Sequence, residues 1–441
     1  MLNAGKYLIV TAIVLSMIGP ANSQEKMTLT LEESIQLALS QNPSHLAAEE
    51  RVEGAKTKIK EAVAGFFPTL SASGLRTLKE KIMVLEFPSF IPGQPPERVE
   101  LDFTRDFQTT FALSVPLFVG GQLKSSFNQA KYNHLSSEES LRQSKQMTVF
   151  NTKRAFFGYL LSQEFVKVAE EAVTVAEKHL NNVQTLYEVG MSSKFDLLRS
   201  EVQLANLKPQ LIKAKNNVKV AELGLKTILG VDLAQPIEID GELTYTPFEP
   251  DLEEALQTAL QNRPEIQQLD YQKLMAGELL KMSRGSRYPT VAVTGAFNFW
   301  ADKLNFKEET WQSYYAINLA VSIPLFRGFV SSAQIAQSKS MIREIELGKK
   351  GLEDMVRFEV RQAILKLEEA KESLLSQEKN VEQAEESLRI AELNFAEGLA
   401  TTLDVSSVQA ALSQAKTNYS QALFDYVVSL AELDKAVGSG V

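Results

Sequence analysis

Two hydrophobic periods divide this chain. In residues 110–117, 291–299 and 316–323, apolar side chains alternate with small or polar ones. A period of two over this many residues predicts β-strands with two unlike faces. A strongly apolar face opposite a small, polar one is typical of transmembrane barrel strands, although a soluble hairpin with one buried face would show the same alternation.

Aromatic residues favour the membrane interpretation of these strands. They gather near the turn-proximal ends of the second predicted hairpin, as an interfacial girdle would: Phe297, Phe299, Trp300, Trp311, Tyr314 and Tyr315. The first predicted hairpin has a long loop instead, with Pro88, Pro92, Gly93, Pro95 and Pro96, and such a loop suits the outer rim of a barrel.

The other period is helical. No proline occurs from Gly120 to about Val189 or from Gly328 to about Glu397, and apolar positions there alternate spacings of four and three. This seam runs from Val356 to Phe395 in one segment, and from Ala155 through Ala176, Leu180 and Val183 to Tyr187 in the other. It predicts coiled-coil helices of about 70 residues, roughly 100 Å long.

Shorter helices flank the long ones. Helices are predicted over Leu31–Ser40 and Leu252–Gln261, and each is followed after a proline by another that ends near Gly65 or Gly285. After each long helix and a tight turn, a returning helix is predicted, from Ser193 to Leu229 and from Thr401 to Val437, with Gly230 and Gly438 as C-caps. Residues 231–250 form an extended linker with room for one short strand.

The whole plan occurs twice. Ser114–Gly120 returns as Ser322–Gly328, a shift of 208 residues, and Phe67-Pro68-Thr69 returns as Tyr288-Pro289-Thr290, a shift of 221. The difference of 13 residues lies in the loop of the first copy. A repeat of this length indicates a tandem domain duplication. We therefore expect a first repeat over 24–230, the linker over 231–250 as an equatorial region, and a second repeat over 251–441.

The N-terminus has the features of an export signal. Lys6 precedes an apolar core from Leu8 to Ile18, and small residues follow at Ala21-Asn22-Ser23. The core is shorter than the roughly 20 residues that a spanning helix needs. We expect residues 1–23 to be a signal peptide, with the mature chain starting near Gln24.

Composition excludes several classes of function. A net charge of −9 argues against a nucleic-acid partner. The chain has no cysteine, which excludes functions that need a thiol or a disulfide. No phosphate-binding loop or nucleophile elbow occurs, so we expect neither an enzyme nor a cofactor. His45, His134 and His179 lack ligand spacing, which predicts no metal site and suggests ordinary surface or helix positions.

Four strands per chain are too few to close a membrane barrel, which needs at least about eight. The alanine-rich helical hairpins also have too little to bury alone. A chain that spans the membrane must therefore oligomerise, and a ring of copies would form a β-barrel continuous with a helical barrel.

The duplicated motifs resemble those of the TolC-like outer-membrane efflux proteins. Phe67-Pro68 precedes a strand, Val115-Pro116-Leu117-Phe118 leads to Gly120-Gly121, and Tyr187-x-x-Gly190 comes before Asp196-Leu197-Leu198. The resemblance implies a homotrimer with a twelve-stranded β-barrel in outer-membrane lipid and a helical tunnel in the periplasm. It also implies an exit duct that works with a periplasmic adaptor and an inner-membrane pump.

The resemblance assigns roles to the two helical turns. Gly190, Met191 and Ser192, with Gly398, Leu399 and Ala400, would form tips that dock onto the adaptor. Simple hairpin turns with left-handed glycines are the alternative, and the two interpretations are compatible.

The resemblance also places an entrance gate beside the tips, at Asp196 and Asp404 with Tyr187 and Phe395. The acids equally fit helix-capping boxes with Ser193 and Thr401. Two further polar gate positions of the family are Ser407 and Ala400 in this chain, so apolar packing at Tyr187 and Phe395 is the expected form of closure.

Two other functions remain open from sequence. One is the outer-membrane component of type I protein secretion, because cargo would be selected at the pump. The other is a secreted coiled-coil scaffold without a channel, against which the amphipathic strands argue.

Overall fold

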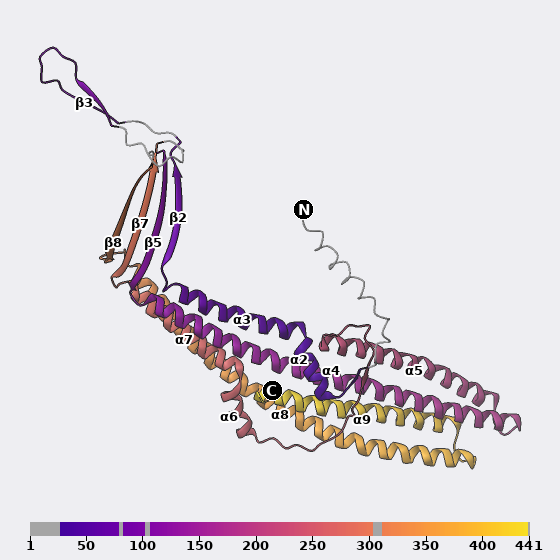
Figure 1. Ribbon diagram of the computed structural model, residues 1–441. Helices are drawn as coiled ribbons and strands as arrows, with labels where there is room; N and C mark the ends of the chain where they lie inside the picture. The colour runs from indigo at the N-terminus through magenta and orange to yellow at the C-terminus, as the bar shows by residue number, and fades with distance from the viewer. Residues whose placement is uncertain (1–26, 79–82, 102–105, 303–310, 440–441) are drawn as a thin grey trace, which may run out of the picture. The chain divides into compact units, whose positions relative to one another are not determined.

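The computed structural model describes residues 27–78, 83–101, 106–302 and 311–439 (Figure 1). The expected signal peptide at 1–23 lies outside these residues. The chain forms two compact units. The first contains the residues up to Glu50, Glu139–Gln267 and those from Gly351 on, and the second contains Arg51–Glu138 and Gln268–Lys350. Each unit therefore combines segments of both copies of the repeat.

The helices follow the predicted plan to within two residues. The first copy has α2 (Leu31–Gln41), α3 (Pro43–Ala64), α4 (Gln122–Glu188) and α5 (Lys194–Leu229). The second has α6 (Leu252–Asn262), α7 (Pro264–Gly285), α8 (Val330–Ala396) and α9 (Thr402–Val437). The agreement reflects strong local signals, since Gly230 and Gly438 end α5 and α9 with φ of 76° and 79°.

The predicted helical seams are the cores of the first unit. Four seam residues of α8 are at most 2% exposed: Val356, Val360, Leu367 and Leu374. They share a core with Tyr426 of α9, whose hydroxyl donates to the carbonyl of Thr246 in the linker at 2.7 Å. A second core joins Tyr159 of the α4 seam, and Phe156 outside the predicted seam, to Leu225 and Leu229 of α5. Each such side chain contributes about 1.5–3 kcal/mol on burial.

The second unit contains an antiparallel sheet in the order β2-β5-β7-β8 (Figure 1). The strands are β2 (Thr69–Arg76), β5 (Phe107–Val119), β7 (Thr290–Ala301) and β8 (Gln312–Ser322). One row of opposed residues runs Ala72, Phe111, Phe297 and Tyr315, and the next runs Ser73, Thr110, Asn298 and Tyr314. Opposed residues share a face, so the predicted apolar and polar faces are confirmed.

The aromatic cluster also forms as expected. Phe297 packs on Phe299 with ring centroids 4.5 Å apart, and Trp300 packs on Tyr314 at 5.5 Å. The first pair lies on the apolar face, whereas Trp300 and Tyr314 share the polar face with Asn298, to whose Oδ1 Thr110 donates at 2.7 Å. Among the described residues, no helix combines the length and apolarity needed to cross a membrane.

Four short strands refine or extend the predicted plan. The linker holds β6 (Ile237–Ile239), as its sequence allowed, and β6 pairs in parallel with β1 (Met27–Leu29). The proline-rich loop of the first copy contains an antiparallel hairpin of β3 (Met83–Phe87) and β4 (Glu97–Leu101), with a Glu86–Arg98 ion pair at 2.7 Å across it.

Close backbone contacts lock the helices to their neighbours in each unit. In the second unit, a Cβ at Gly120 would lie 2.2 Å from the carbonyl oxygen of Gly285. In the first unit, a Cβ at Gly230 would lie 2.4 Å from the carbonyl oxygen of Gln41. Only glycine fits at these two positions, because both also have positive φ.

Candidate functional site: the helical tips and the groove between the hairpins

The two turns that join the long helices have the same geometry. Gly190 and Gly398 have φ of 79° and 73°, and each donates its N–H to the carbonyl three residues back. The next two N–H groups bond a single carbonyl, that of Leu186 in one turn and of Asn394 in the other. This network satisfies the last carbonyls of α4 and α8 and turns the chain sharply.

Both turns present an apolar side chain to solvent. Met191 is 78% exposed and Leu399 is 79% exposed. No hydrogen bond of the turn uses these side chains, since only their backbone N–H groups take part. The turns thus provide two rigid, similar tips whose apolar residues are free to contact a partner.

The two acids beside the tips cap the returning helices. Ser193 accepts from the N–H of Asp196 at 3.1 Å, and Thr401 accepts from the N–H of Asp404 at 3.3 Å. Thr401 completes a capping box, because its own N–H donates to Asp404 Oδ2 at 2.8 Å. Hydrogen bonds from the hydroxyl and the N–H of Thr401 hold the pKa of Asp404 below its usual value.

The two aromatic residues expected at the gate have separate partners. Tyr187 is 39% exposed, and the ammonium of Lys194 lies 5.4 Å from its ring centroid. Phe395 is half-buried and packs on His179, with ring centroids 5.0 Å apart. The packing of Phe395 therefore joins α8 to α4, the first helix of the other hairpin.

The histidines lie in helices, which is one of the two kinds of position expected for them, but two of them are buried rather than at the surface. His45 is 5% exposed and His179 is 6% exposed. His179 occupies the seam of α4, where the sequence placed Leu180, because positions 176, 179 and 183 keep the same spacing of three and four. Among the described residues, no cluster of three or more His, Cys, Asp or Glu could hold a metal ion.

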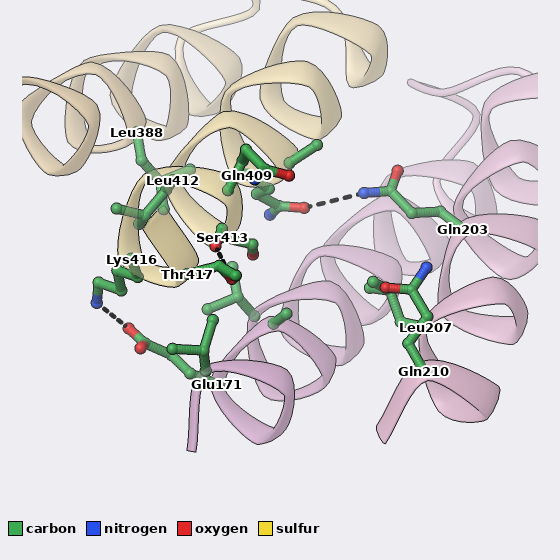
Figure 2. Close-up of a pocket in the computed structure, with 15 residues that line it drawn as sticks. Glu171, Gln203, Leu207, Gln210, Leu388, Gln409, Leu412, Ser413, Lys416 and Thr417 are labelled. Carbon is green, nitrogen blue, oxygen red and sulfur yellow. Dashed lines mark hydrogen bonds and ion pairs between the residues drawn. The ribbon is translucent and has the colours of Figure 1, made fainter. Parts of the chain in front are cut away.

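A groove of about 300 Å³ separates the hairpins α4–α5 and α8–α9 (Figure 2). Two polar contacts bridge it. Lys416 binds Glu171 at 2.7 Å, and Gln203 donates to Gln409 Oε1 at 3.4 Å. The Gln409 side chain is buried, and its Nε2 has no partner among the described residues. These contacts, with Phe395 on His179, join the two hairpins at the tip end of the helices and would have to break for the tips to part.

The buried imidazole predicts an acid-sensitive tip. Burial lowers the pKa of His179, so the unfolded chain binds this proton more readily than the folded one. Its contribution to stability is complete above the unfolded pKa of about 6.5 and is lost as pH falls through the lowered pKa. We expect the protection of amides near residues 176–190, measured as the exchange rate relative to the intrinsic rate at each pH, to fall between pH 7.5 and pH 5.5. In His179→Phe, which keeps a ring against Phe395, this loss of protection should vanish; an unchanged loss would assign it to other groups.

Comparison with known proteins places this geometry in a family. The profile described as outer membrane efflux protein matches residues 34–231 and 255–439. The toluene efflux pump outer membrane protein TtgC of Pseudomonas putida is 22% identical over 419 residues, which cover 93% of this chain and 83% of TtgC. The alkaline protease secretion protein AprF of Pseudomonas aeruginosa is 22% identical over 422 residues, covering 93% and 84%.

A solved structure confirms the fold class. The Campylobacter jejuni CmeC outer membrane channel matches with a TM-score of 0.75 at 17% identity, over 93% of this chain and 86% of CmeC. The fold is thus that of the TolC-like channels, mainly α-helical with the strands of a β-barrel. The relatives named here are efflux, secretion and channel proteins rather than enzymes. With its profile match over both copies of the repeat, the chain belongs to the outer membrane efflux protein family and is a TolC-like protein of the outer membrane.

Proposed function

We propose that this chain forms a homotrimeric exit duct that expels small molecules in a tripartite system with a periplasmic adaptor and an inner-membrane pump. The supporting observation is the sheet β2-β5-β7-β8, which has one apolar face and one polar face and, among the described residues, no strand paired with the outer edges of β2 and β8. Backbone in lipid must be hydrogen-bonded internally, so such a sheet is stable there only when closed. Three copies supply twelve strands, within the range of membrane barrels.

The tips serve as the docking sites for the adaptor in this proposal. Met191 and Leu399 offer exposed apolar contacts on rigid turns, and the flanking residues differ, Ser192 in one tip and Ala400 in the other. A ring of three chains would present two unequal kinds of site in alternation. An adaptor could therefore distinguish the two halves of each chain.

The entrance lies beside the tips. In a trimer, Asp196 and Asp404 would ring the axis and attract cations, and they would cap their helices at the same time. The domain limits proposed above, a removed signal peptide over 1–23 and repeats over 24–230 and 251–441, are compatible with this arrangement.

Phe395→Ala is expected to raise single-channel conductance. The change removes a ring that joins the two hairpins through His179, and deletion of a packed aromatic side chain costs about 3–5 kcal/mol when burial is complete. The half-buried ring should contribute less, but it lies at the proposed constriction. Planar-bilayer recordings of wild type, Phe395→Ala and Phe395→Leu test this. Equal conductance in all three would show that Phe395 does not restrict the entrance.

The similarity to AprF favours type I protein secretion as the second candidate function. Deleting the chain from its host separates the two. Small-molecule efflux predicts that a fluorescent dye accumulates in the deletion strain while the proteins of the culture medium are unchanged. Loss of a secreted protein with normal dye efflux would support the second candidate. No change in either would support a scaffold without a channel.

A further inference from the structure

The duplication extends to the register of the strands. A shift of 221 residues for β2 and of 208 for β5 converts the pair Thr69↔Ser114 into Thr290↔Ser322, which is a pair of β7 and β8. The same two shifts convert every pair of β2 with β5 into an observed pair of β7 with β8. The two shifts therefore relate each residue of a contact in one copy of the repeat to the equivalent residue in the other copy.

One strand pairing of the sheet has no equivalent pairing within the chain. The pairing of β5 with β7 joins the first copy to the second, with Ser114 opposite Thr294 and Thr110 opposite Asn298. Adding 208 to the residues of β5 gives β8, and subtracting 221 from those of β7 gives β2. The equivalent pairing is therefore β8 with β2. Within one chain these strands lie at opposite edges of the sheet, with β5 and β7 between them. The counterpart must involve β2 of another copy.

We infer that β8 of one copy pairs with β2 of the next in a single register, with Ser322 opposite Ser73 and Asn318 opposite Thr77. This inference rests on the proposed function and specifies its interface. The register keeps the faces continuous, because Asn318 and Ser73 both belong to rows of the polar face. A slip of one residue would turn the apolar side chains of β8, such as Ile317 and Leu319, toward the polar side.

The helices of the first unit point to the same partner. Within the chain α4 lies against α9, where Lys435 lies 5.1 Å from the ring centroid of Phe150 and Lys153 binds Asp434 at 3.0 Å. Adding 208 to the residue numbers of α4 gives α8, and subtracting 208 from those of α9 gives α5. The equivalent contact is therefore α8 against α5 of the next copy. Phe150 becomes Phe358, and Ala431, beside Phe150 on α9, becomes Leu223.

Exposure and charge on these two helices agree with a second copy as the occupant. Large apolar side chains are exposed on both: Ile212 68%, Val220 60% and Leu223 45% on α5, with Phe358 59% and Leu365 65% on α8. The charges are complementary, since α5 carries seven Lys or Arg against three Asp or Glu. The part of α8 from Lys366 to Ala396 carries four against eight. A second copy of the chain can therefore cover the exposed apolar side chains of α5 and α8 and pair their charges at the same time.

Disulfide formation tests the register, and the absence of native cysteine makes the result unambiguous. Two double variants are in register, Ser73→Cys with Ser322→Cys and Thr77→Cys with Asn318→Cys. Opposed residues have Cα atoms about 4.5–5.5 Å apart, within disulfide range. The exchanged combinations, Ser73→Cys with Asn318→Cys and Thr77→Cys with Ser322→Cys, use the same cysteines four residues out of register, about 13 Å apart. Phe358→Cys with Leu223→Cys tests the helical contact independently.

The expected result, after oxidation of detergent-purified protein, is covalent dimer and trimer from both in-register variants on non-reducing gels. We expect at least about tenfold less from the exchanged combinations. Oligomeric mass and conductance are measured on the same samples before oxidation. A conducting trimer that links through an exchanged combination, or through none, overturns the register while the proposed function stands. Monomers without conductance in all variants and in wild type would overturn the proposed function, and the inferred interface with it.

Discussion

Gly120→Ala should nearly abolish the folded, membrane-assembled protein. The new Cβ would lie 2.2 Å from the carbonyl oxygen of Gly285, which belongs to backbone and cannot rotate away. The residue also has φ of 63°, where a left-handed conformation costs an L-residue roughly 1–2 kcal/mol. Gly120 lies where strand β5 turns into α4, and Gly285 ends α7. These two backbone segments must move apart to relieve the clash. We expect at least a tenfold loss of folded oligomer recovered from membranes, against a typical total stability of about 5–15 kcal/mol.

Gly121→Ala is the matched control. Gly121 also has a positive φ, 77°, but a Cβ there meets nothing within 4 Å. This variant bears only the conformational cost of roughly 1–2 kcal/mol and should be recovered in quantities near those of wild type. Equal recovery of the two variants would show that the contact between Gly120 and Gly285 does not matter to assembly.

The double variant Met191→Asp with Leu399→Asp should abolish export while leaving the protein folded. Both side chains are almost fully exposed, so their replacement should change stability by no more than about 0.5 kcal/mol. If they are the apolar anchors of the adaptor interface, each loss costs about 2–4 kcal/mol of binding. Tenfold in affinity is 1.4 kcal/mol, so each change weakens docking by about 30- to 1,000-fold. Export is measured as dye efflux from cells that express the variant in place of wild type.

Phe90→Asp is the control for this experiment. Phe90 is fully exposed in the loop between β3 and β4, which belongs to the other unit, so this variant makes the same apolar-to-acidic change at a residue that is not part of the tips. Its efflux should equal that of wild type, and all variants should show the same trimer mass. Normal efflux from the tip double variant would contradict docking at these turns. The two single variants then measure whether the tips contribute unequally.

The helices could be predicted because each signal is local. A heptad seam without proline defines α4 and α8, and glycines at the left-handed positions end them at Gly190 and Gly398. Alternation gave the strands and their two faces, and the repeat allowed each prediction to be checked against its copy. These features depend on neighbours a few residues away, so local sequence patterns are enough to predict them.

Features that depend on distant partners were less accessible. The hairpin β3–β4 was hidden because prolines dominate its loop, although Glu86 and Arg98 face each other across it. His179 was expected at an ordinary surface or helix position; it lies in a helix, but its spacing from Ala176 and Val183 also places it in the buried seam. The close approach of Gly120 to Gly285 joins residues that are far apart in sequence, and no local pattern announces it. The roles of Asp196 and Asp404 at a gate stay predictions, since the contacts found are those of helix caps.

The oligomeric duct is tested most directly by one measurement on the mature chain. The protein is extracted from membranes in detergent, its oligomeric mass is determined with the detergent subtracted, and the same preparation is added to a planar lipid bilayer. A trimer of the 49.0 kDa chain, without the proposed signal peptide, that produces discrete conductance steps is the predicted result. A monomer that produces no conductance would contradict the proposal that copies of this sheet close into a membrane channel.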